Sequence, residues 1–140
     1  MSHVVTLQTN LTDLVVVCKA LDFLGLSYSK DADVRLWNSR KTHSQIVVNL
    51  RSYDIGLSLE NGKVKMTADD MAFDSLVDFP AIKAYTNKEF RYISQETFGN
   101  ILSQAYSIVK AREVAMKLGH QMHISAPDKF GVVHARVVTA

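Results

Sequence analysis

Residues 94–119 read SQETFGNILSQAYSIVKAREVAMKLG, and this pattern predicts the longest helix of the chain. Ser94 can cap its start through the side-chain oxygen, and Gly119 can adopt the left-handed conformation that ends a helix. A helix with one apolar face needs a hydrophobic surface to lie on, and strands predicted before and after it supply one. That face repeats at the three- and four-residue spacing of a helix: Phe98, Ile101, Leu102, Ala105, Ile108, Val109, Ala115 and Met116.

The N-terminal part predicts a strand followed by a second amphipathic helix. Residues 3–9, HVVTLQT, are rich in β-branched side chains, which favour a strand. Asn10 or Thr12 can cap the helix that follows, and Gly25 can end it. The apolar face of this helix comprises Leu11, Leu14, Val15, Cys18, Leu21 and Leu24.

Four strands are predicted in the middle of the chain, at residues 33–37, 45–50, 54–59 and 63–68. Apolar side chains alternate in the last three, which indicates a sheet with one buried face and one solvated face. The last two strands are separated by Glu60-Asn61-Gly62. Asn-Gly tolerates positive φ at both central positions of a tight turn, so these two strands are predicted to form a hairpin.

Residues 69–93 predict an ordered excursion packed on the body of the protein, because they carry too many aromatic residues for a disordered linker. Pro80 can open a short helix through Tyr85. After the long helix, residues 120–125 and 131–138 predict two strands joined by a turn at residues 126–130.

Together these elements predict a single α+β domain over residues 1–140. The expected architecture is an antiparallel sheet of about six to seven strands, with the two amphipathic helices packed on one face.

The composition limits the classes of protein that this chain can belong to. Of its 140 residues 47% are hydrophobic, the formal net charge is +2, and Cys18 is the single cysteine. One cysteine excludes an internal disulfide and a zinc site built on several cysteines. No run approaches the roughly 18 apolar residues of a membrane span. These features predict a soluble, cytoplasmic protein without membrane insertion.

Short motifs along the chain resemble a known family. They are Met1-Ser2-His3, Thr6, Thr9, Asp13-Leu14, Ala20-Leu21 and Leu24-Gly25 near the start, Tyr53-Asp54-Ile55-Gly56 and Ala68-Asp69 in the middle, and Tyr106 to Gly119 near the end. Their order and spacing resemble the family known as hypothetical chloroplast open reading frame thirty-five, a domain of unknown function from cyanobacteria and plastids. Val4 replaces a usual aromatic residue, and residues 73–92 have no clear counterpart in that family.

The resemblance implies an intracellular or stromal protein in a photosynthetic setting, and its departures suggest a divergent member carried by a bacteriophage. It marks Ser2, His3, Tyr53, Asp54 and Gly56 as family-like positions. It implies no reaction, cofactor or catalytic residue.

Three sets of residues are candidates for a chemical site. The histidines His3, His43, His120, His123 and His134 could meet in space around a metal or in a pocket with Asp54 or Asp69, but the favoured interpretation is surface histidines. Cys18 falls on an apolar helix stripe and is interpreted as a buried hydrophobe. The acidic pair Asp69-Asp70, with Asp54 and Asp74, could bind a hard cation or share a proton, but the favoured interpretation of Asp69-Asp70 is a solvated turn that can cap a helix. Asp54 and Gly56 are both interpreted as structural, Gly56 because it allows a close backbone approach.

Charge is segregated between residues 34–53, which are basic, and residues 69–78, which are acidic. Cations interleaved with aromatic residues are typical of single-stranded nucleic-acid binders, and the acidic segment could instead neutralise them within the fold. The candidate binding residues are Arg35, Trp37, Arg40, Lys41, Arg51 and Tyr53.

The sequence therefore leads to a hypothesis of a small non-enzymatic binding or regulatory domain that acts on a protein complex, with no cofactor and no metal. Self-association through an edge strand is a further expectation, because neither terminal strand carries edge protection beyond Arg136. The alternatives are single-stranded nucleic-acid binding through residues 34–53 and an enzyme with a histidine and aspartate pocket.

Overall fold

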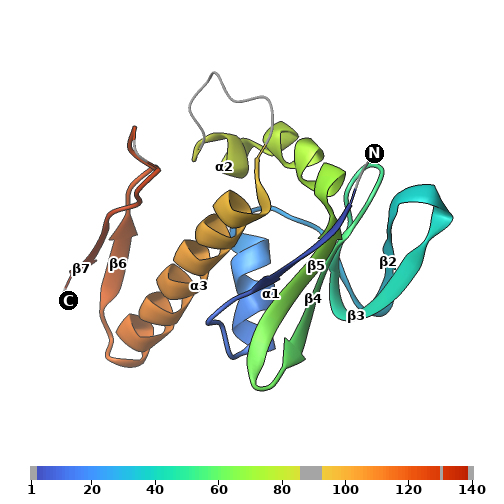
Figure 1. Cartoon of the computed structure of the whole chain (residues 1–140). Helices are drawn as coiled ribbons and strands as arrows, with labels where there is room; N and C mark the ends of the chain where they lie inside the picture. Colours follow the sequence, from blue (N-terminus) through green and yellow to red (C-terminus); the bar gives the residue numbers. More distant parts are fainter. Residues whose placement is uncertain (1–2, 86–92, 130, 139–140) are drawn as a thin grey trace.

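The computed structural model describes residues 3–85, 93–129 and 131–138, and confirms the predicted α+β class (Figure 1). Five antiparallel strands form the main sheet in the order β1-β5-β4-β3-β2. Their bounds are β1 Val4–Gln8, β2 Tyr28–Arg35, β3 Lys41–Val48, β4 Ile55–Glu60 and β5 Lys63–Asp69. The two C-terminal strands, β6 (Gln121–Ile124) and β7 (Ala135–Val138), pair only with each other. The expectation of one sheet with six to seven strands is therefore wrong, because the C-terminal hairpin forms a separate ribbon.

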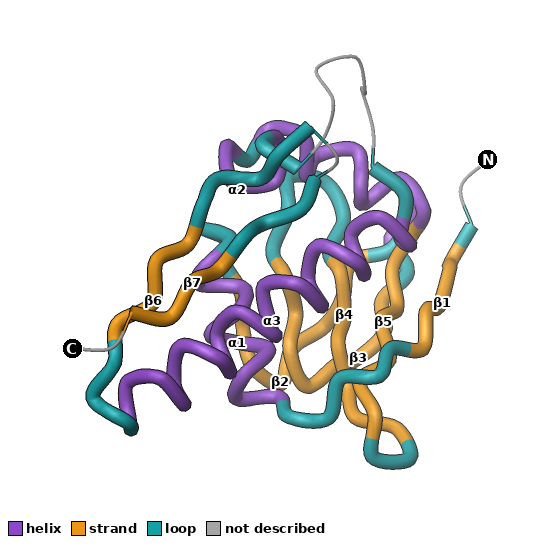
Figure 2. The backbone as a smooth tube through the Cα atoms, turned by 90° about the vertical axis from the view of Figure 1, so that its left-hand side faces the viewer, coloured by secondary structure: helices purple, strands orange, loops and turns teal. Residues whose placement is uncertain are grey.

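The two amphipathic helices, α1 (Leu14–Phe23) and α3 (Gln95–Lys117), lie side by side against one face of the main sheet (Figures 1 and 2). The α3 start is capped by Ser94, whose Oγ accepts from the Thr97 amide at 3.1 Å, and Gly119 after its end has φ of 73°. Both features confirm the sequence prediction. The α1 helix is capped by Asp13 rather than by Asn10 or Thr12, because the Asp13 carboxylate accepts from the first-turn amides.

The main core lies between these helices and the sheet. It is built from alternating residues of the strands and from the apolar stripes of both helices. Its largest fully buried side chains include Leu21, Ile55, Leu57, Met66, Phe73, Phe98 and Leu102. The turn between β4 and β5 is the predicted one, with φ of 54° at Asn61 and 78° at Gly62.

The hairpin β2–β3 bends over the opposite face of the sheet and makes a second, smaller core. Pairing of β3 with β4 covers only Ile46 to Val48, although β3 begins at Lys41. Opposite this divergence, Asp31 in β2 has φ of 49°. The part beyond the bend buries apolar side chains on the back of the sheet: Val34, Leu36 and Val47, with Ala32 beside them. The expectation that one sheet face is simply solvated is therefore wrong under this hairpin.

Gly56 makes this second core possible. A Cβ built on Gly56 would lie 2.2 Å from Ser44 Oγ and 2.6 Å from Val34 Cγ2, so the hairpin can approach only because the position has no side chain. This agrees with the close backbone approach predicted for Gly56 from the sequence.

The predicted excursion at residues 69–93 is ordered where it is described. It contains η2 (Asp70–Asp78), a run of 3-10 helix, and α2 (Pro80–Lys83), which begins at Pro80 as predicted. Phe73, Leu76 and Ile82 are buried in the main core. Residues 86–92 of the excursion lie outside the described residues. Within the described ranges no helix has the length and apolar character needed to cross a membrane.

Gly56→Ala should lower the free energy of unfolding by about 2 kcal/mol, because the added methyl group overpacks the second core. Denaturant unfolding measures the change. Combining it with Val34→Ala should cost less than the sum of the two single changes, because removing the Val34 methyl groups relieves the part of the overlap that Val34 makes. Strict additivity of the two would show that Val34 does not press on Gly56.

Candidate functional site

Asp54 is the best-connected polar side chain of the described structure, and its contacts are structural. Its carboxylate is 2% exposed and accepts from Arg35 Nε at 2.9 Å and from Arg35 Nη2 at 2.8 Å. It also accepts from the backbone amides of Arg35 at 3.0 Å and Leu50 at 3.3 Å. The Asp54 amide in turn donates to the Arg35 carbonyl at 3.1 Å. These bonds fix the end of β2 to the segment that enters β4.

The electrostatics of the pair agree with this role. Burial by itself raises the pKa of the Asp54 carboxyl, but the hydrogen bonds from Arg35 and from the two backbone amides outweigh burial and hold the pKa below its ordinary value. The hydrogen bond to Asp54 likewise raises the pKa of Arg35. Both directions favour the charged forms, so Asp54 and Arg35 form an ion pair.

Asp69 is a second buried carboxylate that holds the same hairpin. It is 1% exposed and accepts from the amides of Met71 at 3.0 Å and Trp37 at 3.3 Å. The first bond caps η2, and the second attaches the tip of the β2–β3 hairpin to the end of β5. Asp69 caps a helix, as the sequence suggested, but the expectation that it is solvated is wrong, because the hairpin covers it.

The predicted basic patch is divided by these contacts. Arg35 is committed to Asp54, and Arg51 Nη2 lies 3.7 Å from Asp78 Oδ2. Arg40, Lys41 and Trp37 are exposed at the hairpin tip. Tyr53 packs half-buried against the main core on the other face of the sheet. Two of the four cations thus pair with carboxylates, and the two aromatic residues do not form one surface.

The described histidines do not converge. His43 lies 3.7 Å from Asp33 and His134 lies 3.2 Å from Asp128, each pair on the surface. His3 meets Asp70 only through its backbone. Cys18 is buried, as its place on the helix stripe predicts. Over residues 3–85, 93–129 and 131–138, no group of three or more histidine, cysteine or acidic side chains could hold a metal. Ser2 lies outside the described residues.

The open edge of β1 is a different kind of feature. In its pairing with β5, the Asp70 amide donates to the His3 carbonyl and the Thr9 amide donates to the Val64 carbonyl. Bonded and non-bonded residue pairs alternate along an antiparallel ladder. The N–H and C=O groups of Val4, Thr6 and Gln8 therefore point away from β5, toward an edge that no described strand occupies.

The two edges of the main sheet differ in their protection. Strand β1 reads VVTLQ, with no charge, no proline and no bulge. Strand β2 at the other edge reads YSKDADVR, and Asp31 with its positive φ distorts it. Charged side chains and local distortion prevent an edge from pairing with another chain. Only β1 retains the features of a strand that can accept a new neighbour in the main sheet.

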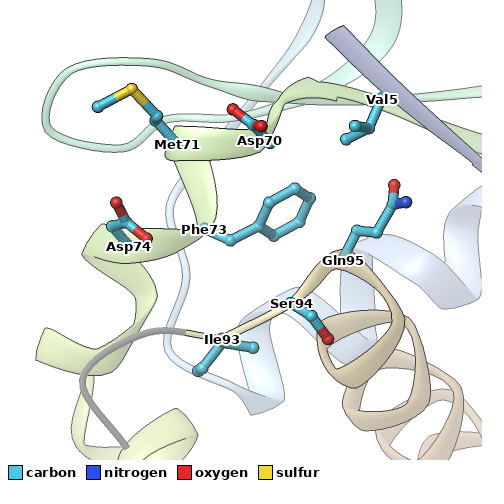
Figure 3. A pocket seen from close by; sticks show the side chains of 8 residues that line it. All are labelled: Val5, Asp70, Met71, Phe73, Asp74, Ile93, Ser94 and Gln95. Atoms are coloured by element: carbon cyan, nitrogen blue, oxygen red, sulfur yellow. The ribbon is translucent and has the colours of Figure 1, made fainter. Parts of the chain in front are cut away.

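Two hollows lie between β1 and α3, and together they are called the groove. The first hollow, of about 530 Å³, lies between the start of β1, η2 and the start of α3 (Figure 3). It is lined by Val5, Asp70, Met71, Phe73, Asp74, Ile93, Ser94 and Gln95. The second, of about 510 Å³, follows the end of β1 and is lined on the helix side by Glu96, Gly99, Asn100, Ser103, Tyr106 and Ser107.

The groove carries negative charge. Asp70, Asp74 and Glu96 are exposed on its walls, and none of them forms an ion pair with a described cation. Neither hollow is lined by a described lysine, arginine or histidine. Lys63 and Lys65 of the neighbouring strand alternate with buried Val64 and Met66, so their side chains lie on the opposite face of the sheet.

The C-terminal ribbon offers a weaker surface. A hollow of about 390 Å³ beside it is lined mainly by apolar side chains, including Val114, Leu118 and Val137. The ribbon has four residues per strand, and an isolated pair of strands is marginally stable in water. The ribbon is not part of a larger sheet, whereas β1 is held by the four other strands of the main sheet.

Comparison of the chain with protein-family models, with curated proteins and with solved structures gave no match.

Sequence reasoning found β1 and its lack of protection but missed the groove. The helix residues that line it share one side of α3 at the spacing Glu96, Asn100, Ser103 and Ser107. In the sequence, this polar stripe beside the apolar face of the helix is the pattern that could have indicated the groove. Nothing in the local pattern indicates that this stripe lies next to β1, because packing between distant segments brings the two together.

Asp54→Asn should lower the free energy of unfolding at neutral pH by about 2 kcal/mol, because the amide loses the charge and turns an NH2 donor toward the N–H donors of Arg35 and Leu50. Denaturant unfolding measures the change. Asp33→Asn on the same hairpin is the matched control, because Asp33 is exposed and pairs only with His43; it should change stability by less than about 0.5 kcal/mol.

The contribution of Asp54 to the free energy of unfolding depends on pH in a defined direction. The Asp54 pKa is lower in the folded protein than the ordinary value of about 3.9, so its contribution is present above pH about 4 and is lost as pH falls through the folded-state pKa. The difference in stability between the wild type and Asp54→Asn should therefore shrink between pH about 5 and pH about 2. A difference that stays constant over this range would contradict the ionised pair.

Proposed function

We propose that this protein is a non-enzymatic binding domain that takes an extended segment of a protein partner along the open edge of β1. The segment adds a strand to the main sheet, so that the outward N–H and C=O groups of Val4, Thr6 and Gln8 pair with it. The observation that carries the proposal is this unprotected edge beside a groove.

The position of β1 supports binding of a strand from outside. Val5 and Leu7 anchor β1 on the main core, so the edge is held rigid by the rest of the sheet. Residues at alternate positions of an added strand would face the α3 side, where the two hollows lie. Backbone bonds would supply affinity, and the hollows would select side chains.

The alternatives have less support. The enzyme hypothesis requires a histidine to meet Asp54 or Asp69, yet Asp54 is engaged by Arg35 and Asp69 by two backbone amides. The nucleic-acid hypothesis requires Arg35, Arg40, Lys41 and Arg51 to share a free basic face, yet Arg35 and Arg51 lie beside carboxylates.

Thr6→Pro tests the proposal directly. Proline removes the outward amide of Thr6, and an edge strand tolerates it because that amide makes no bond to β5. Peptides selected from a random library of about seven residues should bind the wild type, and Thr6→Pro should weaken their binding at least ten-fold. Fluorescence anisotropy with labelled peptides measures the affinity.

The matched control is Lys30→Pro on the opposite edge. The Asn49 amide donates to the Ser27 carbonyl, so by the same alternation the Lys30 amide also points outward. This variant should bind the selected peptides like the wild type, and thermal unfolding of both variants checks that they fold. Equal loss in both variants would refute binding at β1. A wild-type dimer that Thr6→Pro converts to a monomer would instead identify a second copy of the chain as the occupant.

A further inference from the structure

We infer that the hollow at the start of β1 receives a basic side chain, arginine or lysine, of the extended segment. This inference rests on the proposed function and adds the chemistry of the partner: a strand with apolar or small residues and one cation placed to reach Asp70 and Asp74.

The hollow combines the two surfaces that a long basic side chain needs. Its apolar part, which includes Val5, Phe73 and Ile93, can cover the methylene stem. Its polar part has the carboxylates of Asp70 and Asp74 and the side-chain amide of Gln95. Figure 3 shows the Phe73 ring pointing into the middle of the group and the Gln95 side chain extending from α3 toward Val5.

Gln95 adds an independent indication. Gln95 is half-buried, and its Oε1 is shielded from solvent and has no hydrogen-bond partner among the described residues, although a buried amide oxygen normally accepts a bond. A guanidinium or ammonium group is a donor without acceptor capacity, so it suits a hollow whose polar groups include the carboxylates of Asp70 and Asp74. An anionic or purely apolar side chain would leave Oε1 unsatisfied.

The distribution of charge favours a basic partner over a second copy. Two copies paired through β1 would bring two grooves with the same acidic walls to one interface, where like charges are unfavourable. The positive end of the α3 dipole also faces the hollow, but Glu96 already lies in the first turn and Ser94 caps it. Among the described residues, the charge of the walls that no ion pair compensates is therefore that of the carboxylates.

Asp70 also has a structural task. Its Oδ1 accepts from the His3 amide at 3.2 Å, which holds the start of β1. An asparagine at this position can still accept that bond through its own oxygen, so Asp70→Asn removes the charge while keeping the contact. Asp74 accepts no hydrogen bond from a described residue, so no such bond complicates its replacement by asparagine.

The test uses three acetylated and amidated peptides of about seven residues, in which valine and threonine alternate around a central arginine, citrulline or glutamate. Citrulline keeps the shape of arginine without its charge. The arginine peptide should bind the full chain about ten-fold more tightly than the glutamate peptide, with citrulline between them. Isothermal titration calorimetry measures the affinities, and amide exchange locates the peptide on the protein.

The double variant Asp70→Asn, Asp74→Asn should reduce the preference for arginine over glutamate to about two-fold. The control is Asp31→Asn, an exposed carboxylate on the β2 edge where asparagine also tolerates the positive φ, and it should leave the preference unchanged. A preference for arginine that persists in the double variant would overturn the inference.

Two further outcomes separate this inference from the proposed function. If all three peptides bind β1 with equal affinity, strand addition stands and the basic specificity is wrong. If none of them protects the β1 amides, both fail.

Discussion

The buried carboxylate of Asp54 is the constraint on which the distinctive part of this fold depends. An ionised group that is 2% exposed is unfavourable unless its partners compensate, and Arg35 together with two backbone amides does so. Because Arg35 ends β2, satisfying Asp54 requires the β2–β3 hairpin to bend back over the sheet. Gly56 allows that bend by leaving room for Val34. The buried charge of Asp54, which needs a partner, and the absence of a side chain at Gly56 thus determine how the hairpin covers the back face of the sheet.

The same bend leaves the two edges of the sheet unequal. Strand β2 is curved, charged and interrupted at Asp31, so it is a poor template for another strand. Strand β1 is uncharged, and its outward backbone groups have no partner among the described residues. The α3 helix crosses the sheet beside it (Figure 2), and its polar stripe forms the far wall of the groove. Within the described residues, the open backbone groups of β1 and the carboxylates of the groove that form no ion pair therefore lie on one side of the fold.

The sequence predicted what depends on local pattern. The α3 helix with its Ser94 cap, the Asn61-Gly62 turn and the buried position of Cys18 all follow from spacing and turn chemistry. The position of the C-terminal ribbon, the second core and the burial of Asp69 depend on contacts between distant segments, which periodicity does not contain. The basic stretch illustrates the difference: the cations were visible in the sequence, but the partners of Arg35 and Arg51 were set by the folded hairpin. The lack of edge protection on β1 could be predicted, whereas the acidic groove beside it could not.

Hydrogen exchange of the β1 amides tests strand addition most directly. In the free protein the amides of Val4, Thr6 and Gln8 should exchange quickly, because they face the open edge, while those of Val5 and Leu7 should be protected by β5. A bound peptide should slow exchange at Val4, Thr6 and Gln8 and leave Val5 and Leu7 unchanged. Binding that leaves the first three amides fast would place the partner elsewhere and contradict the account.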